Sequence, residues 1–383
     1  MNASAGKRKV AVVTGTRAEF GLLEPVMRAV DAHPALELSV IVAGAHFLPP
    51  AETWREVESR WGHRVGGEVP MQQSGHLGRF HDAIALSHGV SGMAQVFEEV
   101  APHWVVVLGD RVEALAGAAS AAIGGVAVAH LHGGDRAEGV ADESIRHAIS
   151  KLAHLHLAAT AQSAERLRRM GEDDRRVHMV GSPAIDTLGA VRPADDALWE
   201  LVGRPTVLLL YHPIGDSDES ERRRAAEIGA ALAGERVLWL MPNHDPGRDG
   251  VLMGCADASV VQRWTRFDHL PRERFLSVAA RLAAEGGVIV GNSSAGLIEC
   301  AALRLPCVDV GERQAGRERP GTVVHTSGGS EVEIRAAAAQ ARLIDSSRCA
   351  HPYGDGTCGV RSAELFASID PLDRGLLRKR NAY

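Results

Sequence analysis

The sequence predicts an α/β protein built from two Rossmann-like domains, each an open parallel sheet covered by helices. Three observations favour this fold class. Short apolar runs rich in β-branched residues alternate with longer segments rich in Ala, Leu and Glu along most of the 383 residues. The alternation is interrupted once, near the middle of the chain, and polar motifs follow the ends of the apolar runs. Alternation of this kind builds right-handed βαβ units, so the interruption indicates a boundary between two domains.

The first domain is expected to span residues 1–190. Its buried parallel strands are predicted at Lys9–Thr14, Leu36–Ala43, Trp104–Leu108, Val126–His130 and His154–Ala159. Helical patterns occur at Glu19–Ala32, Gly78–Val100, Val112–Ile123, Glu143–Lys151 and Ala161–Met170. Continuous apolar runs of this length are typical of strands that helices cover on both faces.

A linker is predicted at Gly189–Arg204, which contains Pro193 and a pair of aspartates. The second domain is then expected over residues 205–359. Its strands are predicted at Thr206–Tyr211, Val237–Met241, Gly287–Val290 and Cys307–Val310, and its helices at Glu219–Leu232, Pro271–Ala284, Ala295–Leu303 and Glu331–Ile344. Two such domains suggest a cleft between them, with ligands beyond the carboxyl ends of the strands.

Composition argues against several classes of partner. Hydrophobic residues make up 45% of the chain, and the formal net charge is −6, so no basic surplus attracts nucleic acid or anionic lipid. No apolar run approaches the roughly 18 residues of a membrane span, and we expect no signal peptide. The five cysteines form no CxxC pair, which predicts neither disulfides nor zinc and favours a reducing cytoplasm.

In the first half of the chain, two turns and a dense polar segment are candidate sites. Arg17 follows a small-residue turn that could admit a phosphate, although an ordinary strand–helix turn would look the same. Asp110 follows an apolar strand, where it could equally be a helix N-cap. Segments 130–136 and 142–147 hold many ionisable groups, which favours proton transfer with Asp110, Asp135 and Glu143 as candidate acids and bases. The rival interpretation is a metal site that uses His130 and His132, and we expect no metal here.

In the second half, His212 ends an apolar strand, where it could be a core residue or a ligand contact. Ser293 and Ser294 lie between a strand and a helix, where hydroxyls and free N–H groups make an anion site. Glu299, further along that helix, could accept the two hydroxyls of a ribose. The loop around Arg313 could be a solvated charge run or could supply positive charge to a diphosphate.

With these residues in place, the sequence resembles the hydrolysing UDP-N-acetylglucosamine 2-epimerases of sialic acid pathways. Matching motifs occur in the expected order over nearly the whole chain: GTRAEFGLLEP (15–25), LGDRVEALA (108–116), HLHGGDRAEGVADESIRHAISKLAHLH (130–156), LMPNHDPG (240–247), GNSSAGLIE (291–299), GERQAGR (311–317) and PYGDG (352–356). The resemblance implies a GT-B type fold in which a C-terminal helix, at about 360–383, returns to the first domain. It also implies anti elimination of UDP to a 2-acetamidoglucal, followed by addition of water, with no cofactor. In the usual case UDP-GlcNAc and water give ManNAc and UDP.

The resemblance also implies roles for individual residues. Asp110 and Glu143, with Asp142 beside it, match family acids that transfer protons. The residues that match binding positions are Arg17, His212, Ser293 and Ser294 for the diphosphate, Glu299 for the ribose, Arg313 on the nucleotide side, and Asn243 and Arg146 within matching motifs. Some relatives have a glutamate where this chain has His132, and Asp135 is the candidate replacement. Segment 47–75 departs from the family, so the sugar stays open.

Three alternatives follow from the same residues. The enzyme could act on a modified sugar such as UDP-diacetamidobacillosamine. A GT-B glycosyltransferase would share the fold and the nucleotide site. A non-catalytic nucleotide-sugar sensor would need the binding residues without the acids. For the enzyme itself, we expect a homodimer or homotetramer.

Overall fold

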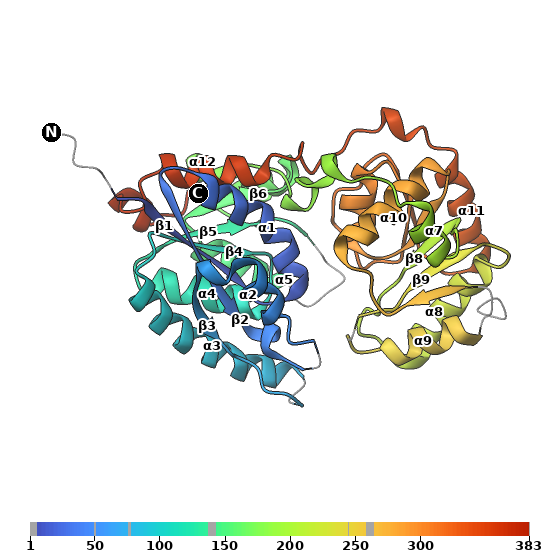
Figure 1. Cartoon of the computed structure of the whole chain (residues 1–383), viewed down its shortest axis with the longest axis horizontal. Coiled ribbons are helices and arrows are strands. Elements are labelled where there is room, and N and C mark those ends of the chain that lie inside the picture. The colour runs from blue at the N-terminus through green and yellow to red at the C-terminus, as the bar shows by residue number, and fades with distance from the viewer. Residues whose placement is uncertain are drawn as a thin grey trace. The chain divides into compact units, whose positions relative to one another are not determined.

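The protein is described by a computed structural model that covers residues 6–49, 51–75, 78–136, 143–243, 245–257 and 264–382. The chain divides into two compact units (Figure 1). Unit 1 contains the described residues of 1–135, 142–186 and 353–383, and unit 2 those of 136–141 and 187–352. Both units are parallel α/β sheets, which confirms the predicted fold class.

The described residues of unit 1 form a seven-stranded parallel sheet in the order β3-β2-β1-β4-β5-β6-β7. The strands are β1 (Arg8–Thr14), β2 (Leu36–Ala43), β3 (Val65–Val69), β4 (Trp104–Leu108), β5 (Ala127–Leu131), β6 (Leu155–Ala158) and β7 (Val177–Met179). The five inner strands match the prediction to within one residue at each end. The sequence analysis missed the two edge strands, β3 and β7, because they are short and partly exposed and lack a continuous apolar run.

The helices of unit 1 are α1 (Arg17–Ala32), α2 (Trp54–Trp61), α3 (Arg79–Val100), α4 (Val112–Ile123), α5 (Glu143–Leu152), α6 (Ala161–Arg169), α12 (Cys358–Ser368) and α13 (Arg374–Leu377). Helix α1 begins where the Thr16 side chain accepts a hydrogen bond from the Glu19 backbone N–H, as an N-cap does. Its apolar positions Phe20, Leu23 and Met27 recur at helical spacing and are buried against the sheet.

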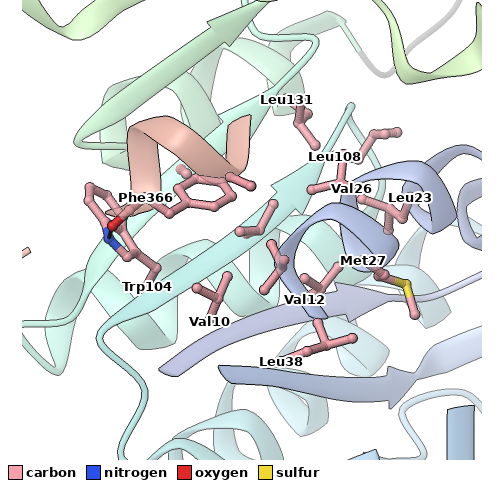
Figure 2. Close-up of a cluster of buried hydrophobic side chains, with 14 of the residues drawn as sticks. Val10, Val12, Leu23, Val26, Met27, Leu38, Trp104, Leu108, Leu131 and Phe366 are labelled. Carbon is pink, nitrogen blue, oxygen red and sulfur yellow. Dashed lines mark hydrogen bonds between the residues drawn. The ribbon is translucent and has the colours of Figure 1, made fainter. Parts of the chain in front are cut away.

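The chain returns to unit 1 at its carboxyl end, as the family resemblance implied. Helix α12 contacts α1 and the β1–β2 side of the sheet. In Figure 2 Phe366 of α12 lies beside Trp104 of β4, with Leu23 and Met27 of α1 in the same cluster. The rings of Trp104 and Phe366 are 5.7 Å apart, and the indole N–H donates to the Phe366 carbonyl at 3.2 Å. Apolar burial therefore fastens helix α12 to unit 1.

The described residues of unit 2 form a six-stranded parallel sheet in the order β10-β9-β8-β11-β12-β13. The strands are β8 (Val207–Leu210), β9 (Val237–Leu240), β10 (Thr265–Phe267), β11 (Val288–Gly291), β12 (Cys307–Val310) and β13 (Val323–Thr326). The helices are α7 (Asp196–Leu201), α8 (Asp218–Ala231), α9 (Arg248–Asp257), α10 (Arg272–Ala284) and α11 (Glu331–Arg342), with a π-helical turn at Gly296–Cys300. The edge strands β10 and β13 were again missed.

The predicted linker is partly helical. Helix α7 lies inside segment 189–204, where Asp195 caps it by accepting from the Leu198 backbone N–H at 2.8 Å. Trp199 of this helix is buried, and the Arg281 guanidinium lies 5.1 Å from its ring. The aspartates that suggested a polar linker therefore start a helix. Among the described helices, none combines the length and apolar character needed to cross a bilayer.

Candidate active site

Asp110 lies directly beyond the carboxyl end of β4. The turn before it depends on Gly109, whose φ of +75° is a left-handed conformation that glycine adopts without a steric penalty. The Asp110 carboxylate forms an ion pair with the guanidinium of Arg146 from α5. Its side chain remains 20% exposed, whereas that of Arg146 is 3% exposed. Asp110 is thus a fixed carboxylate that still reaches solvent.

His130 holds the same turn through the backbone. Its Nε2 lies 2.7 Å from the Gly109 carbonyl oxygen, and its Nδ1 lies 3.1 Å from the Ser150 hydroxyl. A carbonyl can only accept, so Nε2 carries the proton and Nδ1 accepts from Ser150. Burial lowers the pKa of His130 to about 3, and the nearby Arg146 charge adds to the effect. The ring is therefore a neutral link between α5 and the peptide that precedes Asp110.

His132 supports Asp110 by another route, since its backbone holds Arg146, the partner of Asp110. Its φ is +60°, and its carbonyl accepts from Arg146 Nη1 at 3.1 Å. Its Nδ1 lies 2.7 Å from Asp135 Oδ2 and its Nε2 lies 3.0 Å from the Ser182 hydroxyl. Asp135 also accepts from the Ser163 hydroxyl at 2.7 Å. Both ring nitrogens of His132 are thus occupied by protein groups, which disfavours the metal alternative for this histidine.

Two further predicted residues of unit 1 lie on the first turns of helices. Glu143, in α5, has a side chain that is 24% exposed, and its Oε1 lies 3.3 Å from His147 Nε2. Arg17, the first residue of α1, is exposed and lies 3.3 Å from Glu56. Asp142 lies outside the described residues. The structure therefore brings Asp110, Arg146, His132 and Asp135 together and places Glu143 one turn before Arg146.

The sequence analysis missed a pair of buried carboxylates, Glu19 and Glu113. The Glu19 carboxylate accepts from the Gly15 backbone N–H at 3.0 Å, and Glu113 accepts from the Gln72 amide at 2.8 Å. A Cβ at Gly15 would approach the Glu113 side chain to 2.5 Å, so this glycine leaves the space that Glu113 fills. Burial, followed by the negative charge of Glu113, raises the pKa of Glu19 to about 8. From sequence alone, both look like ordinary acids in the first turn of a helix.

In unit 2, the carboxyl ends of β8 and β11 are joined by Asn292. Its side chain accepts from the His212 backbone N–H at 2.8 Å and donates to the His212 carbonyl at 2.7 Å. The two strands come close because Gly291 has no side chain; a Cβ there would lie 2.0 Å from the Leu210 carbonyl oxygen. His212 Nδ1 accepts from the Asn243 backbone N–H at 3.1 Å. Burial and then the Arg313 charge lower the pKa of His212 to about 3, so it is a neutral ring.

Ser293 and Ser294 follow this junction at the start of the helical segment 294–302. The Ser293 hydroxyl accepts from the Ala295 backbone N–H at 3.4 Å, and both serines are partly exposed. First-turn N–H groups of a helix have no partner inside the helix, so they attract anions. The predicted helix start after β11 is therefore present, and the anion site at it stays a prediction.

Glu299 and Arg313 are the other two predicted nucleotide contacts of unit 2. Glu299 lies within the π-helical turn, and its Oε1 accepts from Arg272 Nη1 of α10 at 2.7 Å. Arg313 donates to the Asn292 carbonyl at 3.2 Å, as does the buried Gln314 amide at 2.9 Å. Gln314 and Arg272 were not predicted, since nothing in the local sequence sets either apart from a surface residue.

Several known proteins are similar to this chain along most of its length. The family model described as UDP-N-acetylglucosamine 2-epimerase matches residues 28–367. A relative from Legionella pneumophila, a UDP-N,N'-diacetylbacillosamine 2-epimerase (hydrolyzing), is 34% identical over 98% of this chain and 100% of its own. A UDP-N-acetylglucosamine 2-epimerase from Neisseria meningitidis is 32% identical over 83% of this chain and 84% of its own.

A solved structure supports the fold. The UDP-GlcNAc 2-epimerase from Neisseria meningitidis bound to UDP-GlcNAc superimposes with a TM-score of 0.74, at 16% identity, over 94% of this chain and 100% of that chain. At that identity the likeness shows the fold alone. The match of the family model over most of the chain, together with the two relatives, shows that this chain belongs to the UDP-N-acetylglucosamine 2-epimerase family.

Proposed function

We propose that this chain is a hydrolysing 2-epimerase that converts a UDP-2-acetamido sugar and water into UDP and the free sugar inverted at C2. The observation that carries the proposal is Asp110, a carboxylate fixed by Arg146 and by the His130–Gly109 bond yet still partly exposed. A rigid and accessible carboxylate beyond the end of a parallel strand is suited to general acid–base chemistry.

The proposed reaction has two steps. A carboxylate removes the proton from C2, a double bond forms between C1 and C2, and the C1–O bond breaks so that UDP leaves with its electron pair. Water then adds across the double bond. Its oxygen bonds to C1, and a proton is delivered to C2 on the face opposite to the one from which the first proton was removed. Asp110 and Glu143 are the two candidates for these proton transfers, because their side chains are 20% and 24% exposed. The Asp135 side chain is only 3% exposed and is bound to His132 and Ser163, which suits a supporting role.

Unit 2 supplies the proposed nucleotide contacts. The Ser293–Ser294 helix start, with His212 and Arg313, would stabilise the charge that develops on the departing UDP. Glu299, oriented by Arg272, would accept the ribose hydroxyls. Asn243 lies beside His212 and is a further candidate contact. From unit 1, Arg17 would bind the diphosphate.

Two sugars are candidates. UDP-N-acetylglucosamine is the substrate in the family description, and the product would then be N-acetylmannosamine. The relative that is 34% identical over 98% of this chain is named for UDP-N,N'-diacetylbacillosamine, which makes that sugar the second candidate. Incubating the enzyme with each in turn and measuring UDP release would identify the preferred one.

Product analysis in deuterated water tests the chemistry. Elimination predicts deuterium at C2 of the released sugar, because the new C2 proton comes from solvent. A product that keeps its C2 hydrogen would contradict elimination and favour a glycosyltransferase-like cleavage at C1. Binding of both UDP-sugars without any UDP release would favour the sensor alternative.

A further inference from the structure

A second polar cluster lies at the C-terminal end of α5, away from the carboxylates described above. Its centre is Lys379, whose ammonium donates at 2.9 Å to each of the backbone carbonyls of Ser150, Lys151 and Ala153. The first two carbonyls belong to the last turn of α5, and that of Ala153 directly follows the helix. The last carbonyls of an α-helix have no partner inside the helix. A cation at this end also interacts favourably with the helix dipole. Lys379 therefore caps the helix that carries Arg146.

The charge of Lys379 is balanced by a buried carboxylate. Lys379 Nζ lies 2.6 Å from Glu172 Oε2, and the Glu172 side chain has no exposed surface. Burial by itself would raise the pKa of Glu172, but hydrogen bonds from His156, Lys151 and Lys379 lower it to about 2. Since Lys151 and His156 lie 2.7 and 2.8 Å from the carboxylate, Glu172 keeps two partners if Lys379 is replaced.

The C-terminal segment is also fastened on both sides of Lys379. The Ala382 backbone N–H donates to the Gly171 carbonyl at 2.7 Å, and Arg176 donates to the Leu376 carbonyl at 3.0 Å. Asn381 accepts from the Lys151 ammonium at 2.7 Å. This segment therefore holds a defined place against the end of α5.

Helix α5 connects the cluster to Asp110 in two ways. Arg146, one turn before Ser150, forms the ion pair with the Asp110 carboxylate. The Ser150 side chain bonds His130, and His130 bonds the Gly109 carbonyl that precedes Asp110. The backbone carbonyl of the same Ser150 is one of the three that Lys379 binds. A shift of α5 along its axis would therefore move both supports of Asp110 at once.

We propose that Lys379 is a positioning residue for catalysis: by anchoring the end of α5, it holds Arg146 and His130 at the distances that orient Asp110. This inference rests on the function proposed above, in which Asp110 acts on the sugar. Under this proposal Lys379 does not contact the substrate. Its effect belongs to the turnover step, since the placement of a reacting group by as little as about 1 Å changes rates strongly.

The first test replaces Lys379 and measures kcat and KM separately for the better of the two UDP-sugars. K379M should lower kcat by roughly tenfold, while the UDP dissociation constant, which depends on the proposed contacts of unit 2 and on Arg17, stays within about twofold. K379R keeps a cation with several donors and should recover part of kcat. The matched control is R380M, because Arg380 is the exposed cation next in the same segment. If kcat of K379M equals that of R380M, the proposal is wrong.

A double variant separates positioning from a general loss of stability. Arg146→Lys keeps the charge but not the two-pronged geometry, so it removes much of what Lys379 is proposed to position. K379M should then lower kcat of R146K by less than about twofold, as expected for residues that act through one another. An equal tenfold loss in both backgrounds would contradict the proposal.

Hydrogen exchange provides a readout that does not depend on activity. Amides of peptide 143–152 should exchange faster in K379M than in wild type and R380M, while peptide 207–231 of unit 2 should not change. Unchanged exchange in peptide 143–152 would overturn the anchoring itself. If the wild type releases no UDP from either sugar, the proposed function fails, and the anchoring of α5 is then decided by this exchange measurement alone.

Discussion

The two units differ in how the polar groups near the carboxyl ends of their strands are paired. In unit 1 the charged groups at the carboxyl ends of the strands bind one another: Arg146 binds Asp110, and Asp135 binds His132. In unit 2 the ends of β8 and β11 are joined by a neutral amide, Asn292. Buried polar atoms without a hydrogen bond to a described residue occur in both units, for example Arg146 Nε in unit 1 and Gln314 Oε1 in unit 2. The difference therefore lies in the charges at the strand ends, and preorganised charges suit the chemistry proposed for unit 1.

The sharpest way to break this comparison is to neutralise Asp110. Asp110→Asn should lower turnover by a factor on the order of 10²–10⁴, because the amide cannot accept the C2 proton. The UDP dissociation constant, measured by isothermal titration calorimetry, should stay within about twofold, since the proposed nucleotide contacts of unit 2 are unaltered. Glu143→Gln is expected to behave in the same way. A variant that loses UDP affinity and turnover in parallel would show that the two units do not divide these roles.

Unit 1 should also be the source of a pH-dependent stability. The pKa of Glu19 is raised from 4.5 to about 8 by burial and by Glu113. The folded state therefore keeps a proton that the unfolded state loses above pH 4.5. This contribution to stability is complete below that pH and declines as pH rises toward 8, by up to about 1.4 kcal/mol per pH unit.

Glu19→Gln should remove this decline, because glutamine is neutral at every pH. Thermal unfolding followed at several pH values between 5 and 9 measures the effect. Glu58→Gln, at an exposed position of α2, is the control and should leave the wild-type slope intact. A slope that is the same in wild type and E19Q would mean that Glu19 is ionised across this range.

The binding role of unit 2 is tested at the helix start. Ser294→Ala should weaken UDP binding by about 1–2 kcal/mol, the usual loss for a hydrogen bond to a charged group, and leave kcat at saturating substrate nearly unchanged. Ser330→Ala removes a serine that caps another helix of unit 2, α11, and should not affect UDP affinity. Unchanged UDP affinity in both S293A and S294A would rule out this anion site.

The smallest expected effect concerns the ribose. Glu299 should make the wild type prefer UDP over 2′-deoxy-UDP by about 1 kcal/mol, and Glu299→Ala should remove the preference. Arg272→Met should reduce it, because Arg272 holds Glu299 at 2.7 Å. Equal affinity of the wild type for both nucleotides would exclude Glu299 as the ribose contact.

Much of the fold could be predicted because the inner strands carry their own signal. β4 is buried and apolar throughout, and β1, β2 and β5 contain the buried apolar runs 10–13, 40–43 and 127–129. Edge strands have one solvent-exposed side and need less apolar surface, and β3, with two glycines in five residues, carries no such pattern. The sequence analysis missed helix α7 because aspartates are common both at helix N-caps and in polar linkers.

By itself, the sequence determined which residues follow strands, and this placed Asp110, His132, His212 and Ser293 at the ends where ligands bind in parallel sheets. Only the tertiary structure decided which of these side chains are bound by other protein groups and which remain available to a ligand. Ser182 bonds His132 across 50 positions, and Gln72 bonds Glu113 across 41, because sheet order brings distant turns together. The same holds for Lys379, which is 229 positions from Ser150. Hydrogen bonds act over about 3 Å of space, whatever the separation along the chain, so no local pattern could reveal them.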